Sequence, residues 1–153
     1  MRFSTTPHPR ILTSRNLEQD QRPDGVSELE FGMAEQPLFK SAQVAQTSLD
    51  AETVFADHGV VSRTLFATTT TRIVLFAFAE GQSLSEHSTP RDVVVQMLSG
   101  RCEFTANDKK HALVAGDLLH LPPGSPHSLH ALEKFSMLLT MAKADIAVVT
   151  PQP

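Results

Sequence analysis

Short runs of β-branched, aromatic and alternating residues dominate the chain from residue 59 onward. Turn-forming residues, such as Asn107 and Asp108, interrupt the runs roughly every 8–12 residues, which is the spacing of turns in all-β sandwiches and barrels. Residues of these types suit the pleated, half-buried surface of a strand. We therefore predict an all-β domain. Its strands are expected at residues 59–66, 71–79, 92–98, 111–114, 118–121, 128–132 and 135–141, with another around Cys102 and Phe104.

The N-terminal part of the chain has a different pattern. Residues 1–32 have few apolar positions, no sustained period and several prolines, so they cannot bury enough surface to offset the entropy of ordering. We predict residues 1–32 as a disordered or weakly ordered tail, residues 33–148 as the barrel domain and residues 149–153 as a C-terminal tail. A single helix is expected at residues 48–55, where Ser48 can act as the N-cap.

Composition narrows the functional classes. Of the 153 residues, 41% are hydrophobic and 20% are charged, so a sizeable core can form. The net charge is −4 without a basic stripe, and Trp and Tyr are absent, which argues against nucleic acid or an anionic membrane as a partner. No apolar stretch is long enough to cross a bilayer. Cys102 is the only cysteine, so no intrachain disulfide can form, and we expect a cytoplasmic protein.

Two glycine-anchored motifs hold the candidate chemistry. In the first, five residues separate Gly81 from His87, and Thr89 follows two positions later. Further along the same motif, six residues separate Val93 from Gly100. Both glycines follow predicted strands, where tight turns need the backbone freedom that glycine has. The spacing of the glycines therefore has a physical reason in the predicted turns.

In the second motif, five residues separate Gly116 from a Pro-Pro-Gly turn that ends at Gly124, and two residues separate Gly124 from His127. Over roughly residues 58–142, the two motifs together resemble those of the cupin superfamily. The resemblance implies a small single-domain cupin, which is a double-stranded β-helix or jelly-roll barrel closed around one pocket. Gly124 is then expected at a turn position with positive φ, which places His127 at the mouth of the barrel.

The resemblance also implies where a metal would bind. Metal-binding cupins use two histidines and a glutamate of the first motif and the histidine of the second. This chain keeps His87 and His127 but has Thr89 and Val93 at the other two places. His87 and His127 are thus candidate ligands for one divalent transition metal (iron, nickel, manganese or zinc), although such sites usually use three or four protein donors. A further donor would need a β-bulge to turn inward; the candidates are Glu86, Asp92 and Gln96.

Side chains alternate across a strand, so parity predicts which of them face the interior of the barrel. His87 and His127 are expected to face the pocket. His120 and His130 have the opposite parity and are expected on the exterior of the sheets. The other residues expected to line the pocket are Thr89, Val93, Val95, Met97, Leu119, Leu121 and Leu129.

Three functions compete for this barrel. The leading hypothesis is a small-molecule-binding cupin of sensing or accessory type, with a mostly apolar pocket lined by His87 and His127. The alternative is a metal-dependent enzyme of dioxygenase or isomerase type, which the resemblance implies for many relatives. The third is a structural barrel that acts through partner proteins, because one fold hosts many functions. Cys102, on one strand face with Phe104, is expected in the core rather than as a nucleophile.

The expected partners are a small-molecule ligand and a second copy of the chain. The resemblance to small cupins implies a homodimer. The segment from Pro37 to Val44 precedes the first confident strand, so we expect it to pair with a sheet edge or to exchange between protomers.

Overall fold

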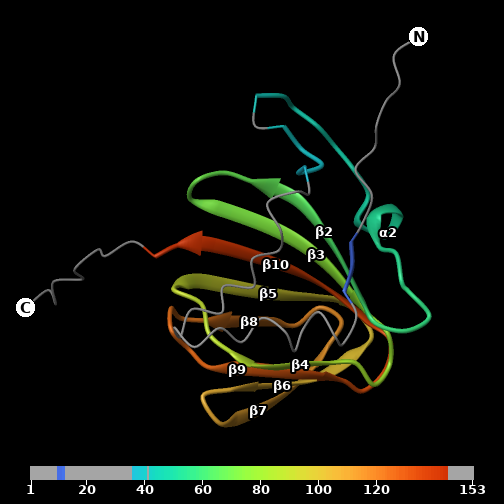
Figure 1. Cartoon of the computed structure of the whole chain (residues 1–153), viewed down its shortest axis with the longest axis vertical. Coiled ribbons are helices and arrows are strands. Elements are labelled where there is room, and N and C mark those ends of the chain that lie inside the picture. The colour runs from blue at the N-terminus through green and yellow to red at the C-terminus, as the bar shows by residue number, and fades with distance from the viewer. Residues whose placement is uncertain (1–9, 13–35, 41, 145–153) are drawn as a thin grey trace, which may run out of the picture.

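The computed structural model describes residues 10–12, 36–40 and 42–144, which form two antiparallel β-sheets packed face to face (Figure 1). The predicted tails at 1–32 and 149–153 lie outside the described residues, apart from one short strand at Arg10–Leu12. The strands are β1 (Arg10–Leu12), β2 (Val60–Ala67), β3 (Thr71–Phe78), β4 (Ser83–His87), β5 (Arg91–Ser99), β6 (Arg101–Ala106), β7 (Lys109–Val114), β8 (Leu118–Leu121), β9 (His127–Ala131) and β10 (Phe135–Lys143).

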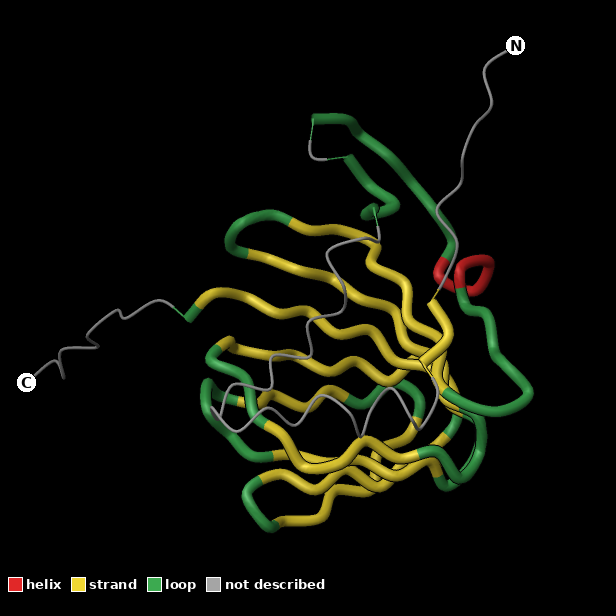
Figure 2. Tube along the Cα trace, in the orientation of Figure 1, coloured by secondary structure: helices red, strands yellow, loops and turns green. Residues whose placement is uncertain are grey.

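The order of the strands is that of a jelly roll. One sheet has the order β1-β2-β3-β10-β5-β8, and the other has the order β4-β9-β6-β7. From β3 onward the chain crosses repeatedly between the two sheets, and Figure 2 shows the strands of both curving around a shared interior. The predicted all-β jelly-roll barrel is thus confirmed. Among the described residues, no helix is long and apolar enough to span a membrane.

Alternation along β5 shows why these residues form the barrel wall. Val93, Val95 and Met97 are at most 2% exposed, whereas the intervening Val94 and Gln96 are exposed. A strand with one buried face must keep this register, because a slip by one residue would turn every buried side chain outward. Inside the barrel the aromatic rings of Phe78 and Phe135 stack with their centroids 4.6 Å apart. The interior is therefore a packed apolar core at this level.

Besides β1, which lies within the predicted N-terminal tail, two elements differ from the sequence predictions. The strand β4 at Ser83–His87 is not predicted, because its pattern of serines and one leucine lacks β-branched residues. The helix α2 spans only Leu49–Glu52 and ends before the β-branched Thr53 and Val54, which disfavour helix. Ser48 stands at the N-cap position but makes no capping hydrogen bond with its side chain.

Glycines at strand ends have the backbone conformation that the motifs require. Gly124 has a φ of 78°, as predicted for its turn. Gly100 has a φ of 70°, and a Cβ atom there would lie 2.1 Å from the carbonyl oxygen of Lys134. Only glycine fits at Gly100 without a movement of the backbone. The turn at Gly116 is closed by Asp117, whose carboxylate accepts a hydrogen bond from the backbone N–H of Val114 at 2.9 Å.

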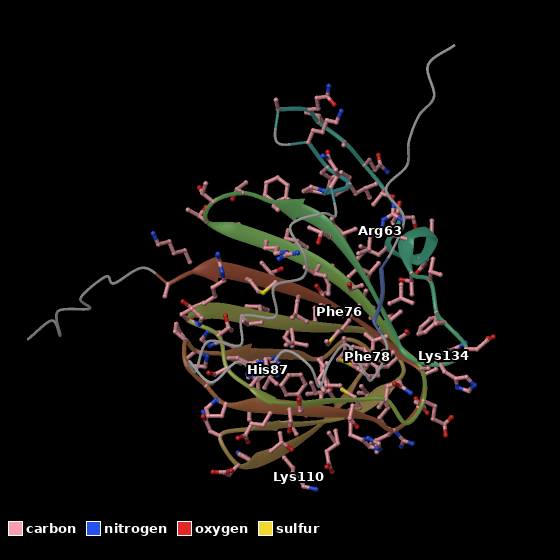
Figure 3. The ribbon with its side chains drawn as sticks, viewed as in Figure 1. Arg63, Phe76, Phe78, His87, Lys110 and Lys134 are labelled. Atoms are coloured by element: carbon pink, nitrogen blue, oxygen red, sulfur yellow. The ribbon has the colours of Figure 1, made fainter. Side chains whose placement is uncertain are left out.

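The segment that contains α2 lies along the outer side of β2. The backbone N–H of Leu38 donates to the carbonyl oxygen of Thr64, and that of Phe39 donates to the carbonyl oxygen of Leu65. Arg63 lies beside α2 (Figure 3), and its Nε atom is 2.9 Å from a carboxylate oxygen of Glu52. Backbone pairing and a largely buried ion pair thus hold this segment on the sheet.

Candidate functional site

His87 and His127 face each other inside one end of the barrel. His87 is the last residue of β4 and His127 the first residue of β9, and the two are paired directly across these antiparallel strands. Their ring centroids lie 4.3 Å apart, with the ring planes inclined by 60°. In Figure 3, His87 lies in the interior to the left of Phe76 and Phe78. The pairing of two strands therefore brings together histidines that are 40 positions apart in the sequence (87 to 127).

A bulge in β4 turns His87 inward. Leu84 is 7% exposed and belongs to the core, yet His87 stands an odd number of positions later and also faces inward. The pairing of β4 with β9 shifts register between these two residues. A bulge adds one residue to a strand and reverses the alternation that follows it. Ser85 and Glu86 occupy the bulge and are exposed, so Glu86 does not join the two histidines.

The two imidazoles are oriented in the same way. Nδ1 of His87 lies 2.8 Å from the backbone carbonyl oxygen of Ser85, and Nδ1 of His127 lies 2.8 Å from that of Ser125. A carbonyl oxygen only accepts hydrogen bonds, so each Nδ1 must carry the proton and donate it. In the neutral ring Nε2 then holds a lone pair. Both histidines therefore offer Nε2 as an acceptor or metal ligand.

Burial keeps this histidine pair neutral. Desolvation lowers the pKa of His87 and outweighs the opposing effect of its hydrogen bond to Ser85. Desolvation likewise lowers the pKa of His127, and repulsion from a charge on His87 lowers it further, against the effect of the bond to Ser125. Since the ordinary pKa of histidine is about 6.5, both rings are uncharged at neutral pH.

The surroundings of the pair are mostly apolar. The ring of Phe104 stacks on that of His127, with the centroids 5.9 Å apart and the planes inclined by 17°. Val93 and Leu121, each 2% exposed, belong to the same buried cluster as Phe104. A polar contact nearby connects backbone groups: the carbonyl oxygen of Thr89 accepts a hydrogen bond from the N–H of Gly124 at 2.8 Å. This bond ties the loops that carry the two histidine motifs.

Comparison with known proteins identifies the fold family. A model of the cupin domain matches residues 74–142. A solved structure of a conserved protein of unknown function from Streptococcus pyogenes is 33% identical to this chain, with a TM-score of 0.62, over 70% of this chain and 92% of that one. The chain belongs to the cupin domain family. No curated protein matches it.

Two other similar structures are of cupin proteins. A cupin superfamily protein from Desulfitobacterium hafniense is 28% identical, with a TM-score of 0.62, over 67% of this chain and 94% of that one. The cupin domain of Cnp3 from Schizosaccharomyces pombe is 16% identical, with a TM-score of 0.59, over 67% of this chain and 76% of that one. The second likeness shows the fold alone. The family assignment rests on the cupin-domain match and on the Streptococcus pyogenes structure, and neither assigns a ligand.

The alternation predicted for this cupin is observed on the strands that flank the histidines. On β5, β8 and β9 the residues expected inside are buried or, for Leu119, packed half-buried against the core. His120 is exposed, with Nε2 3.0 Å from a carboxylate oxygen of Asp92. His130 is exposed, with Nδ1 2.8 Å from the hydroxyl of Ser83. That the interior residues line a ligand pocket stays a prediction; they are Thr89, Val93, Val95, Met97, Leu119, Leu121 and Leu129.

The donor set is smaller than that of a typical metal-binding cupin. Among the described residues, no group of three or more His, Cys, Asp or Glu side chains could hold a metal ion. Of the three candidates for a third donor, Glu86 and Gln96 are exposed, and Asp92 contacts His120 on the outer face. Transition-metal sites usually use three or four protein donors. Two imidazoles alone therefore do not fit a resident transition metal.

Sequence reasoning missed two contributors to this site. The carbonyl groups of Ser85 and Ser125 fix the tautomer of each histidine, but a backbone acceptor leaves no mark in residue identity. Phe104 stacks on His127 because β6 and β9 are neighbours, with Ala106 paired to His127. The shared parity of Phe104 with the core was visible in the sequence, whereas the pairing of β6 with β9 was not.

Proposed function

We propose that this cupin binds a small organic molecule inside the barrel, in a sensing or accessory role. The observation that carries the proposal is the pair His87 and His127, two neutral imidazoles held by backbone carbonyls in an apolar surrounding. Ligand pockets usually combine apolar walls with a few directed polar groups. With Nδ1 committed to the backbone, each Nε2 accepts a hydrogen bond, so the ligand carries O–H or N–H donors.

A metal-dependent enzyme of dioxygenase or isomerase type is the alternative. The observation in its favour is the orientation of the rings, because metal-ligating histidines commonly donate their other ring N–H to a carbonyl or carboxylate. His87 and His127 have this arrangement. The absence of a third donor among the described residues weighs against it. A barrel that works only through partner proteins is the remaining reading, and it assigns no ligand to the histidines.

The proposal includes a cytoplasmic location and a homodimer, and the barrel is compatible with a reducing compartment. Cys102 is a free, buried thiol next to Met97, so the described part of the barrel needs no disulfide. The stability of the fold then comes from packing and not from a disulfide bond.

Elemental analysis of the full-length protein, purified without chelator, separates these functions. We expect far less than one equivalent of iron, nickel, manganese or zinc, and no change in melting temperature with EDTA. Ligand-observed NMR against small organic molecules should find binders that His127→Ala weakens by about 1–3 kcal/mol, the cost of an unpaired polar group. His130 is exposed, so His130→Ala is the matched control and should bind the same molecules as tightly as the parent protein does.

Two outcomes would replace the proposal. Stoichiometric metal that disappears in His87→Ala would assign a metalloprotein, and chelation should then lower the melting temperature, because metal stabilises the state that binds it. A folded protein with neither metal nor any small-molecule binder would favour the structural barrel.

A further inference from the structure

The two histidines offer hydrogen-bond acceptors that no described part of the chain uses. Nδ1 of each ring donates to a backbone carbonyl oxygen, so the lone pair of each neutral ring lies on Nε2. Among the residues that the structure describes, no group donates a hydrogen bond to Nε2 of His87 or His127. Neither Nε2 atom is sealed from solvent inside the core. Both lone pairs are therefore open to a molecule that enters this end of the barrel.

The two rings are close enough for one molecule to contact both. His87 and His127 are paired directly across β4 and β9, and their ring centroids are 4.3 Å apart. A hydrogen bond to a ring nitrogen spans about 3 Å between the heavy atoms. Two donor groups on neighbouring atoms of one ligand can thus each reach one ring. A ligand with a single donor would leave one of the two acceptors without a partner.

The charges around the pair favour an uncharged ligand. Burial lowers the pKa of both rings, so neither carries a charge at neutral pH, and a carboxylate would meet two lone pairs there. The guanidinium of Arg72 donates to the hydroxyl of Thr64 and is directed toward β2. In the described part of the chain no carboxylate joins the histidines, because Glu86 is exposed and Asp92 contacts His120 on the outer face. A charged ligand would therefore lack an opposite charge, and burial of an unpaired charge is costly.

Apolar side chains surround the pair. The ring of Phe104 stacks on that of His127. Val93 is paired with Leu121 on β8 and with Met141 on β10. Val93 and Leu121 belong to the buried cluster that contains Phe104, and Met141 packs against this cluster. None of these side chains donates a conventional hydrogen bond. The part of a ligand that lies against them is therefore expected to be apolar.

We propose that the ligand is an uncharged molecule with two neighbouring hydroxyl groups on an apolar body, and that each hydroxyl donates to Nε2 of one histidine. This inference rests on the proposed ligand-binding function. A hydroxyl group suits the pair, because its one proton satisfies one ring. A primary amide can also offer two N–H donors, but its carbonyl oxygen needs a donor in return, and the pair and its apolar surroundings supply none.

Two series of probes vary the number and the position of the donors. Catechol, guaiacol and veratrole share one ring and carry two, one and no O–H groups, whereas hydroquinone has the atoms of catechol with its hydroxyls at opposite ends. Styrene glycol and phenethyl alcohol make the same comparison of two donors with one on an aliphatic chain. In ligand-observed NMR titrations of the full-length protein at neutral pH, with EDTA present to prevent chelation of metal, catechol or styrene glycol should bind about fivefold or more tightly than its one-donor relative.

Variants of the histidines show which groups accept these donors. His127→Phe removes one acceptor and keeps an aromatic ring, so the preference for two neighbouring hydroxyls over one should disappear. His130→Ala changes an exposed histidine and should retain the preference of the wild type. Should His127→Phe fail to fold, His87→Phe removes the other acceptor from a less buried position, and the same loss of preference is expected.

The outcomes distinguish this inference from the function on which it rests. The inference is wrong and the ligand pocket stands if probes with two, one and no donors bind equally, if hydroquinone binds as tightly as catechol, or if the preference survives in a folded His127→Phe. The same conclusion follows if none of these probes binds but other small molecules do. If no small molecule binds, the inference and the proposed function are both contradicted.

Discussion

The rings of His87 and His127 face each other with their centroids 4.3 Å apart. Nδ1 of each ring is hydrogen-bonded to the backbone carbonyl oxygen two residues earlier in the chain. A charge on His87 would lower the pKa of His127, in addition to the effect of burial on both. The surroundings therefore favour the uncharged form of both rings, and protonation of either ring should destabilise the folded state.

The stability of the barrel should fall as the pH drops below about 6.5. Desolvation lowers the pKa of both histidines in the folded state. The unfolded chain, with histidines near their ordinary pKa of about 6.5, then binds protons first, so the free energy of unfolding decreases through this range. The double variant His87→Gln/His127→Gln should show a flatter dependence in urea denaturation. Identical pH profiles of parent and variant would contradict the lowered pKa values.

Cys102 should resist alkylation in the folded protein. Burial raises the pKa of this thiol to about 11, and its Sγ atom lies 3.8 Å from Sδ of Met97 in the core. The thiolate is the reactive form, so the reaction with iodoacetamide near pH 8 should be about a hundredfold slower than in denaturant. Mass spectrometry over time measures both rates, and Cys102→Ser controls for reaction at other residues. Rapid labelling of the native protein would place the thiol outside the core.

Substitution of Gly100 should destabilise the barrel more than substitution of Gly124. Both have positive φ, where an added Cβ strains the backbone by about 1–2 kcal/mol. At Gly124 the added atom meets nothing within 4 Å, but at Gly100 it lies 2.1 Å from the carbonyl oxygen of Lys134. In urea denaturation, Gly124→Ala should lose about 1–2 kcal/mol, and Gly100→Ala should lose more than about 3 kcal/mol. Gly124→Val should lower the free energy of unfolding more than Gly124→Ala does, because β-branched residues tolerate positive φ least. Equal losses for the two alanine variants would contradict the steric argument.

The sequence predicts interior positions well where strands are regular. Along β5 the alternation of Val93, Val95 and Met97 with exposed neighbours follows from a two-residue period, and the same period places His120 outside. In β4 a two-residue period does not predict which side chains face inward, because a bulge lies between Leu84 and His87. His87 faces inward as expected, but through the cupin motif rather than through any period visible in β4.

The cross-strand neighbours of Arg72, a residue of β3, could not be predicted from the sequence. Its parity with Val74 places it on the interior face, but its neighbourhood depends on β10 lying between β3 and β5. That order pairs residues that are distant in the chain, such as Arg72 with Met141. Non-local strand order is set by the packing of the whole barrel, so local patterns do not reveal that this cation lies in one row with Val93.

The homodimer is predicted to depend on the segment from Pro37 to Val44 and not on the first 32 residues. Within this segment, the amides of Leu38 and Phe39 donate to the carbonyls of Thr64 and Leu65 and so cover an edge of β2. In a dimer that exchanges this segment, the same hydrogen bonds would join the segment of one protomer to β2 of its partner. The segment therefore shapes the surface that a second copy would contact.

Light scattering on three forms of the protein tests this prediction. The full-length chain and a form without residues 1–32 should both have the mass of a dimer. A form without residues 1–46 should dissociate more readily on dilution, because it lacks the amides of Leu38 and Phe39 that pair with β2. Phe39→Pro removes one of these N–H donors and should also weaken the dimer. Gln36→Pro serves as the control, because among the described residues the backbone of Gln36 makes no hydrogen bond to β2. A monomeric full-length chain would contradict the homodimer, and a stable dimer without residues 1–46 would move the interface to another face of the barrel.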